Sequence, residues 1–426
     1  MNQPRLAYIS FDIVPAPKGA AIHIAAFAQA LAGEFGGVHL VTVSPTSEPT
    51  QPQELWQGVI QTTLPAIGDT LINRVLYFRT MLGAWWQGRR FEAVHIRSIY
   101  EGFPIALNKK RLCDKLIFEV NGLPSIELKY RYPAVADDRE LLQKLKAQEQ
   151  ICLDASDLIV TPSCVTRDYL QTRDVPASKI RVIPNGVDLD VFTYDPEATR
   201  KRVGEAGKEL LPYTSCYSSP FRLLYFGTLS AWQGVNLAVE ALALACRDFP
   251  VELMVIGIGR DRTCQTLKQL ALKLGVANQL TILPPVSQAE LVGYLHSSDA
   301  VVAPLTPNDR NLVQGCCPLK VLEAMGSGTP IIASDLPVVR ELGIDGVHFL
   351  LVKPGSAKGI KDALMKLWLD PGLGSQLAVA ARQRIENYYT WKQAGNALVE
   401  AYEELGITRA STSCSRNFST SREYSA

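Results

Sequence analysis

Short apolar runs alternate with longer amphipathic segments along most of the chain. The runs are rich in Val, Ile and Leu, as expected of strands buried on both faces, and the segments between them have the length of helices. In the first half the predicted strands are RLAYIS (5–10), VHLVTV (38–43), EAVHI (92–96), KLIFEV (115–120), DLIVT (157–161) and IRVIPN (180–185). In the second half they are RLLYFG (222–227), ELMVIG (252–257), LTILP (280–284), AVVAPL (300–305), TPIIAS (329–334) and VHFLLV (347–352).

Strands that alternate with helices predict a doubly wound parallel sheet in each half. A polar stretch at 194–220 separates the halves and is the expected linker. We therefore expect an α/β protein of two Rossmann-like domains, 1–193 and 221–388, which face each other across a central crevice. A helix at 389–406 is expected to pack back on the first domain, and the Ser- and Thr-rich tail 407–426 is expected to be disordered.

Composition narrows the class of protein. The 43 Lys and Arg nearly balance the 42 Asp and Glu, so the overall charge does not attract nucleic acid. The nine cysteines form no CxxC pair and have no histidine at metal-ligand spacing, which predicts reduced thiols and no metal site. The N-terminus lacks a secretory signal pattern, and no window is apolar enough to span a membrane. We expect a cytoplasmic protein with neither a metal nor a nucleic-acid partner.

Several segments place glycines at strand–helix turns or polar residues at strand ends. They are PKGAAIHIAAFAQALAGEFGGVHLVTV (17–43), LIVTPSCVTRDYL (158–170), KIRVIPNGVDLDVF (179–192), LLYFGTLSAWQGVNLAVEALA (223–243), LMVIGIGR (253–260) and KVLEAMGSGTPIIASD (320–335). In order and spacing they resemble the family 4 retaining glycosyltransferases, whose two Rossmann-like domains form the fold called GT-B. The resemblance implies transfer of a sugar from a nucleotide-diphosphate sugar to an acceptor hydroxyl, with retention of configuration and no metal or cofactor. The implied partners are a nucleotide-sugar donor and a carbohydrate or lipid-linked acceptor.

The glycine turns of both halves are expected to bind the donor. Gly19 and Ala20 stand between the first strand and a helix, where small side chains let helix N–H groups approach a phosphate. A plain tight turn is the alternative. Gly257 lies in the second-half turn that resembles the next glycine turn of the family. The resemblance implies that Glu323 accepts hydrogen bonds from the ribose hydroxyls, because a carboxylate can take two donors at once.

The chain departs from the family pattern at three of the expected donor-site positions. The first of two family glutamates falls at Gly315, and the family's diphosphate-binding arginine and lysine fall at Thr228 and Gln233. One anionic and two cationic groups are therefore missing. Thr228 and Gln233 can still donate neutral hydrogen bonds to phosphate.

A leaving diphosphate develops negative charge, so catalysis needs a fixed positive group near it. Lys320 shares a helix face with Glu323, and both side chains are expected to point into the crevice. We therefore predict that Lys320 is a relocated catalytic cation, with Glu323 beside it and Arg310 in the preceding loop as a second cation. The alternative is an exposed Lys320–Glu323 pair, which would contribute little.

Three residues are predicted on the acceptor side. His23 lies one turn into the first helix, and Glu119 and Asn121 end the strand of FEVNGLP (118–124). Polar residues at the ends of parallel strands often reach the crevice, where they can bind the acceptor. A structural histidine and a simple Asn121–Gly122 turn are the alternatives.

The segment 71–90 joins apolar residues and two tryptophans with four arginines. A basic, Trp-bearing helix predicts peripheral contact with the inner face of a membrane, as a lipid-linked acceptor would require. The alternative is a helix that simply covers the sheet.

Fold alone does not establish activity. The altered positions leave open a non-catalytic GT-B scaffold that has lost donor turnover. A nucleotide-sugar epimerase or a phosphorylase would share the architecture, but the sequence does not place the acid and base carboxylates of the first or the cofactor lysine of the second.

Overall fold

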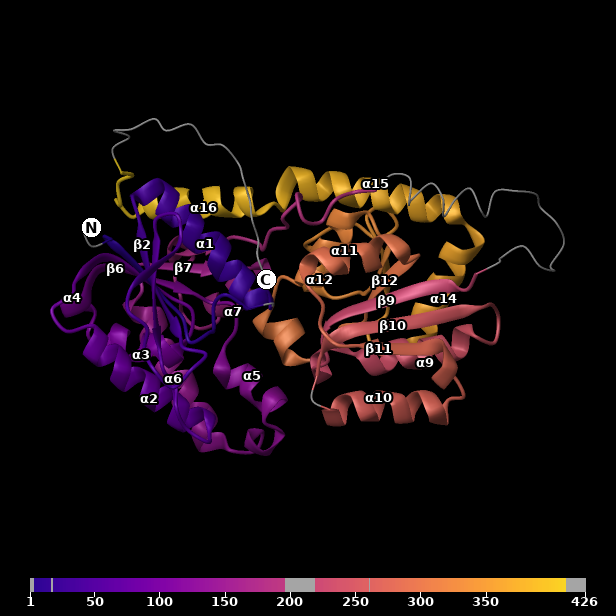
Figure 1. Ribbon diagram of the computed structural model, residues 1–426, viewed down its shortest axis with the longest axis horizontal. Helices are drawn as coiled ribbons and strands as arrows, with labels where there is room; N and C mark the ends of the chain where they lie inside the picture. Colours follow the sequence, from indigo (N-terminus) through magenta and orange to yellow (C-terminus); the bar gives the residue numbers. More distant parts are fainter. Residues whose placement is uncertain (1–3, 17, 196–218, 260, 411–426) are drawn as a thin grey trace.

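Two α/β domains lie side by side, as the strand pattern predicted (Figure 1). The computed structural model describes residues 4–16, 18–195, 219–259 and 261–410. The N-terminal domain holds an eight-stranded sheet and the C-terminal domain a six-stranded sheet, and each sheet has a separate apolar core on either face. The prediction of two Rossmann-like halves is confirmed. Most of the expected linker and tail lies outside the described residues.

The N-terminal sheet has the order β3-β4-β2-β1-β5-β6-β7-β8. All six strands expected in this half are present, and every neighbouring pair is parallel except β3–β4, an antiparallel edge that the apolar pattern did not predict. The apolar pattern missed β4 because this strand contains buried polar residues. One of them, Gln61, donates to Val14 O and Thr42 Oγ1 inside the domain. The strands are β1 (Leu6–Ile9), β2 (Val38–Val43), β3 (Gln53–Trp56), β4 (Val59–Leu64), β5 (Phe91–Ile96), β6 (Cys113–Glu119), β7 (Leu158–Thr161) and β8 (Ile180–Val182).

Helices cover both faces of this sheet. One face carries α1 and the last helix of the chain, and the other carries α2, α3 and α6, each through its buried apolar side chains. The helices are α1 (Gly19–Phe35), α2 (Leu71–Trp85), α3 (Ile99–Leu107), α4 (Lys109–Leu112), α5 (Pro124–Arg131), α6 (Arg139–Ala155) and α7 (Cys164–Gln171), with short turns η1 (Pro133–Val135) and η2 (Ala177–Lys179).

The C-terminal sheet is parallel throughout, in the order β11-β10-β9-β12-β13-β14. Its strands are β9 (Phe221–Thr228), β10 (Val251–Ile258), β11 (Leu280–Leu283), β12 (Ala300–Ala303), β13 (Ile331–Ser334) and β14 (Leu350–Val352). Its helices are α9 (Val235–Ala245), α10 (Asp261–Lys273), α11 (Gln288–Ser297), α12 (Leu319–Ser327), α13 (Pro337–Arg340), α14 (Ala357–Leu369) and α15 (Pro371–Tyr388), with turns η3 (Ala231–Gln233), η4 (Ala277–Gln279) and η5 (Arg310–Gln314).

The chain passes twice between the domains, and the two crossings lie against each other. Val187 N donates to Tyr389 O at 2.8 Å, and a Cβ atom at Gly186 would lie 2.3 Å from Trp391 N, so the close approach requires glycine there. After this crossing α16 (Trp391–Glu404) packs on α1 in the N-terminal core. At the start of the expected tail, Ile407 is buried in the same core, whereas residues 408–410 are exposed and Ala410 N donates to Glu34 O of α1.

A second contact between the domains joins α5 to η5. Asp309 accepts hydrogen bonds from Lys129 and from the Tyr130 hydroxyl, and Arg310 Nε donates to Glu127 Oε1 at 2.9 Å. In Figure 1, α5 lies on the side of the N-terminal domain that faces the C-terminal domain. We call this set of three ion pairs and hydrogen bonds the α5–η5 clasp, defined by Glu127, Lys129, Tyr130, Asp309 and Arg310.

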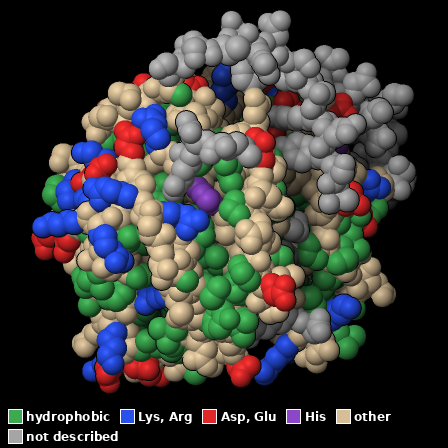
Figure 2. Space-filling view, turned by 60° about the vertical axis from the view of Figure 1, so that its left-hand side comes forward, with side chains coloured by type: hydrophobic (Ala, Val, Ile, Leu, Met, Phe, Trp, Pro, Cys, Tyr) green, Lys and Arg blue, Asp and Glu red, His purple; other side chains and the backbone are tan. Residues whose placement is uncertain are grey.

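The segment 71–90 behaves largely as a helix that covers the sheet. Trp85 and Trp86 are buried in the core, and Arg79 donates to the carbonyls of Ile99 and Tyr100. The exposed apolar side chains of α2 are Ile72, Leu76 and Tyr77. Figure 2, which turns the left-hand side of Figure 1 forward, shows a face on which apolar side chains lie among Lys and Arg. Among the described residues, no helix is long and apolar enough to cross a membrane.

Candidate functional site

A cavity of about 840 Å³ lies between the two domains. Ten of the twelve residues predicted from the sequence line it, and Glu119 and Gly315 do not. The ten are Gly19, Ala20, His23, Asn121, Thr228, Gln233, Gly257, Arg310, Lys320 and Glu323.

The starts of two helices meet across this cavity. Neither α1, which begins at Gly19, nor α12, which begins at Leu319, has a side-chain cap at its N-terminus. A Cβ atom at Gly19 would lie 2.7 Å from Cδ1 of Leu319, so Gly19 also allows the two domains to approach. Uncapped N–H groups and the positive end of a helix dipole favour an anion.

Lys320 lies in the first turn of α12 and lines the cavity with only 8% of its surface exposed. Its Nζ has no hydrogen-bond partner among the described residues and lies 3.9 Å from the centre of the Tyr225 ring. Burial lowers the pKa of Lys320 to about 7, and the charge of Glu323 opposes this shift. A buried ammonium without an acceptor is unfavourable unless an anion completes the site.

Glu323 lies one turn further along α12 and also lines the cavity. Burial raises its pKa to about 7, while Lys320 and a hydrogen bond with Gln288 oppose the rise. The alternative of an exposed Lys320–Glu323 pair is wrong, because Lys320 is buried and no ion pair within 4 Å joins the two side chains in the described structure. Gln288, at the start of α11, was not singled out from the sequence.

The end of β9 and the turn after it supply neutral groups at the positions of the missing family cations. Thr228 and Gln233 both line the cavity, and Gln233 Oε1 is buried without a hydrogen-bond partner in the described part of the chain. Gly227 and Gly257 pair across β9 and β10, and a Cβ atom at Gly257 would lie 2.0 Å from Gly227 O. Gly257 is therefore required by the sheet itself.

Arg310 lines the cavity, but its charge is already engaged by the α5–η5 clasp. Besides its bond to Glu127, its guanidinium carbon lies 5.1 Å from the centre of the Trp232 ring. On the described C-terminal wall of the cavity, Lys320 is therefore the cation without an anionic partner.

Gly315 faces the N-terminal domain rather than the cavity. A Cβ atom there would lie 2.6 Å from Ser163 Oγ and 2.7 Å from Thr166 N at the start of α7. Its backbone, with φ 83° and ψ 166°, is also one that side chains other than glycine rarely adopt. Gly315 therefore does not line the cavity, and the position leaves no room for the family's glutamate.

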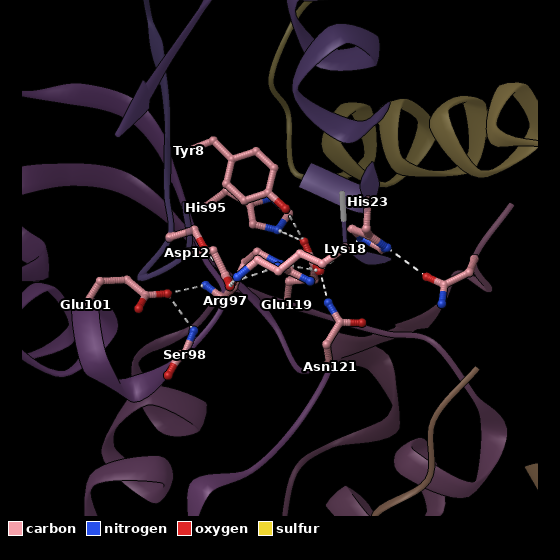
Figure 3. Close-up of polar contacts among 12 residues, drawn as sticks. Tyr8, Asp12, Lys18, His23, His95, Arg97, Ser98, Glu101, Glu119 and Asn121 are labelled. Carbon is pink, nitrogen blue, oxygen red and sulfur yellow. Dashed lines mark hydrogen bonds and ion pairs between the residues drawn. The ribbon is translucent and has the colours of Figure 1, made fainter. Parts of the chain in front are cut away.

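Glu119 was expected to contact the acceptor, but it is 1% exposed and lies behind the cavity wall. It accepts hydrogen bonds from Tyr8, Arg97 and Asn121, and ring nitrogens of two histidines lie within 3.0 Å of it (Figure 3). Burial alone would raise the pKa of Glu119, but Arg97 and His23 hold it well below its usual range. The position of Glu119 at the end of a parallel strand led to the expectation that it reaches the crevice. Its side chain points into the domain instead, because the hydrogen-bond donors around it lie there.

His23 links this buried cluster to the other domain. Its Nε2 lies 2.9 Å from Glu119 Oε1, and its Nδ1 lies 2.7 Å from Asn185 Oδ1. The Asn185 amide in turn donates to Cys317 O, at 2.8 Å, in the loop before α12. A chain of polar contacts thus runs from the N-terminal core to the loop that precedes Lys320.

Asp12, Lys18 and Arg97 also line the cavity, and sequence reasoning assigned them no role. Asp12 lies 2.8 Å from Lys18 Nζ and 3.4 Å from an Arg97 amino group. Burial opposes the shift, but these two cations lower the pKa of Asp12. Arg97 directly follows β5, so the strand-end rule applied to EAVHI would have found it.

Two facing Rossmann-like domains, with uncapped helix starts at the cavity between them, define a GT-B protein. Residues 17–191 match the family model described as Glycosyltransferase Family 4, and residues 220–370 match the model described as Glycosyl transferases group 1. The chain belongs to the family 4 glycosyltransferases.

Curated relatives match over part of their length. The D-inositol 3-phosphate glycosyltransferase of Xylanimonas cellulosilytica is 27% identical over 274 residues, 64% of this chain and 62% of the relative. The glycogen synthase of Mycobacterium tuberculosis strain H37Rv is 27% identical over 263 residues, 62% of this chain and 58% of the relative. The matches thus cover less than two thirds of each relative.

Solved structures share the fold over nearly the whole chain. Sucrose-phosphate synthase from Thermosynechococcus elongatus has a TM-score of 0.77 at 19% identity, over 94% of this chain and 98% of that one. Anabaena HepE in complex with UDP has a TM-score of 0.67 at 15% identity, over 94% of this chain and 100% of that one.

Proposed function

We propose that this protein transfers a sugar from a nucleotide-diphosphate sugar to an acceptor hydroxyl, with retention of the anomeric configuration and without a bound metal. The observation that carries the proposal is Lys320, a buried ammonium that lines the interdomain cavity and has no hydrogen-bond partner among the described residues. A donor diphosphate would supply the missing acceptor and the missing negative charge. Membership of family 4 supports the same reaction class.

In the proposed complex the diphosphate lies between Lys320, Thr228 and Gln233. Lys320 stabilises the charge that develops as the bond to the sugar breaks, and the uncapped N-terminus of α12 adds a partial positive charge. Glu323, one turn along the helix, accepts the ribose hydroxyls. Retention follows from attack on the face that the leaving group occupies.

The acceptor proton passes to an oxygen of the leaving diphosphate. The other carboxylates that line the described cavity are engaged, since Asp12 is held by Lys18 and Arg97, and Glu127 by Arg310. With Glu323 assigned to the ribose, the leaving phosphate is the base nearest the reacting bond. Lys320 then holds the product diphosphate while the diphosphate gains the proton.

Donor binding is the first test. UDP-, GDP-, ADP- and dTDP-sugars are titrated by calorimetry, with UDP-glucose first because a structural neighbour was solved with UDP-glucose. Slow donor hydrolysis is then followed without acceptor. Lys320→Ala and Glu323→Ala should each lose most of the turnover, and Lys366→Ala, on the exposed face of α14, should not.

The scaffold alternative predicts a different result. If no nucleotide sugar binds, or if the Lys320 and Glu323 variants turn the donor over at the wild-type rate, the proposed donor site is wrong. Binding without hydrolysis or transfer to any acceptor would favour the non-catalytic scaffold.

A further inference from the structure

The acceptor half of the cavity carries more positive than negative charge. Its charged lining residues in the N-terminal domain are Lys18, Arg74, Arg97 and Arg131 against Asp12 and Glu127. Both carboxylates are already neutralised, Asp12 by Lys18 and Arg97, and Glu127 by Arg310 from the opposite domain. Arg97 is further paired with the buried Glu119. Arg74 and Arg131 are therefore the two arginines of this lining whose charge is not yet accounted for.

Arg74 and Arg131 make no ion pair within 4 Å in the described part of the chain. Arg74, in the first turn of α2, donates through Nε to Ala66 O at 3.1 Å. This bond orients the guanidinium and leaves its two terminal amino groups to donate to a ligand. Arg131, the last residue of α5, lies with its guanidinium carbon 5.7 Å from the centre of the Tyr132 ring. Two oriented guanidinium groups thus reach the cavity from different helices.

Tyr100, in the first turn of α3, also lines the cavity. Burial raises the pKa of its phenol, Glu127 adds to the rise, and Arg131 opposes it. The phenol therefore stays protonated and available as a hydrogen-bond donor. Two guanidinium forks and a phenol suit the oxygens of a phosphate, which accept bidentate bonds from arginine.

We propose that the acceptor carries a phosphate or diphosphate group, and that Arg74, Arg131 and Tyr100 bind this group at the acceptor side of the cavity. The proposal rests on the proposed function, because it treats the opposite wall, with Lys320, as the place of the donor diphosphate. Arg74 is half-buried and Arg131 is exposed, and a neutral sugar would bring no negative charge to pair with either guanidinium.

Two kinds of acceptor carry such a phosphate group. A soluble sugar phosphate would present its phosphate directly, and a lipid-linked sugar would present a diphosphate with a hydrocarbon chain beyond it. Leu71 of α2 lines the cavity, and the next residue, Ile72, is 58% exposed, followed one turn on by the exposed Leu76. An apolar surface therefore starts where the phosphate site opens, and a lipid chain could lie along it.

The test measures acceptor-side binding with the donor side filled. The protein is first saturated with the nucleoside diphosphate of the best-binding donor. Glucose 6-phosphate, glucose 1-phosphate and glucose are then titrated by calorimetry, and a polyprenyl diphosphate-linked sugar is titrated in detergent micelles. The variants are Arg74→Gln, Arg131→Gln and Arg74→Lys, with Arg139→Gln as the control, an exposed arginine of the same domain outside the cavity lining.

We expect at least one phosphorylated probe to bind while glucose does not. Arg74→Gln and Arg131→Gln should each weaken that binding about tenfold or more, because a hydrogen bond to a charged group is lost. Arg74→Lys should keep part of the affinity, and Arg139→Gln should keep all of it. Binding of the soluble phosphates identifies the soluble source, and binding of the micellar probe alone identifies the lipid-linked source.

The proposal is overturned if no phosphorylated probe binds more tightly than glucose. It is also overturned if both glutamine variants bind like the wild type. Donor titration and acceptor-free donor hydrolysis are measured on the same samples, so a failure of the proposed function appears there separately. Thermal unfolding of each variant shows whether it is folded.

Discussion

The ammonium of Lys320 lies 3.9 Å from the centre of the Tyr225 ring, at the wall of the interdomain cavity. A Cβ atom at Gly227 would lie 3.5 Å from Lys320 Cε, so the glycine leaves room beside the lysine side chain. The aromatic ring stabilises the cation by up to about 2 kcal/mol but offers no hydrogen-bond acceptor. The three N–H donors of the lysine therefore remain for a ligand.

Donor affinity should depend on pH in both directions around neutrality. Above about pH 7 Lys320 loses the charge that attracts the diphosphate, and below about pH 7 Glu323 gains a proton and can no longer accept two ribose hydroxyls. Calorimetry with the nucleotide sugar between pH 5.5 and 8.5 should give a maximum near neutrality, with a fall of up to roughly tenfold per pH unit on each side.

Two variants separate the limbs of this pH profile. Lys320→Gln should remove the alkaline fall, and Glu323→Gln the acidic fall, while Lys366→Gln should leave the profile unchanged. A profile that stays flat across neutrality in the wild-type protein would contradict the assignment of both groups to the donor.

Restoring the family's glutamate at Gly315 should damage the protein. Gly315→Glu places a side chain against Ser163 and Thr166 and forces a backbone conformation that costs about 1–3 kcal/mol for a residue other than glycine. Thermal unfolding should show a clear drop in midpoint, and donor turnover should not rise.

Gly346→Glu is the matched control for this substitution. Gly346 also has a positive φ, 71°, but a Cβ atom there meets nothing within 4 Å. The Gly346→Glu variant should therefore be destabilised by backbone strain alone. If Gly315→Glu were as stable as the wild type and more active, the described position of residue 315 would be wrong.

Removing the buried carboxylate of Glu119 should strongly destabilise the N-terminal domain. Glu119→Ala removes the buried carboxylate that pairs with Arg97 and leaves the buried guanidinium without it. We expect this to lower the free energy of unfolding by about 3–5 kcal/mol. Glu92→Ala, which removes a half-exposed pair with Arg5, should cost at most about 1 kcal/mol. Urea unfolding monitored by tryptophan fluorescence measures both.

The pH dependence of stability gives an independent check on Glu119. Its pKa is below the usual range in the folded protein, so its contribution is present above the ordinary carboxylate pKa of about 4.3 and is lost as the pH falls below that value. Between pH 6 and 3 the wild-type protein should therefore lose more stability than Glu119→Gln. Equal losses would show that the carboxylate is not held ionised by its neighbours.

The α5–η5 clasp should hold the domains together. Asp309→Ala removes the acceptor for both Lys129 and Tyr130, which should shift the equilibrium toward open forms by about 1 kcal/mol, roughly fivefold in population. Small-angle scattering should show a larger radius of gyration. Asp335→Ala, which removes a pair with Arg340 within the C-terminal domain, is the control, and an equal change in both variants would contradict the role of the clasp.

Most of the fold could be predicted because both sheets are built from apolar strands buried on two faces. The exceptions, β3 and β4, show the limit of that signal. β3 is an edge strand with exposed residues, and β4 hides Gln61 behind specific hydrogen bonds. A polar side chain with buried partners looks like a surface residue when only the sequence is read.

The sequence by itself determined the two halves, the turns between strands and helices, and the spacing that carries Lys320 and Glu323 on one helix face. These depend on residues near one another along the chain, through apolar periodicity and helix geometry. Tertiary structure alone decided which polar groups are free. It engaged Arg310 with Glu127, turned Glu119 into the core, packed Gly315 against α7 and left Lys320 without an acceptor in the described structure. The physical reason is that ion pairing and burial depend on partners far apart in sequence, some of them in the opposite domain.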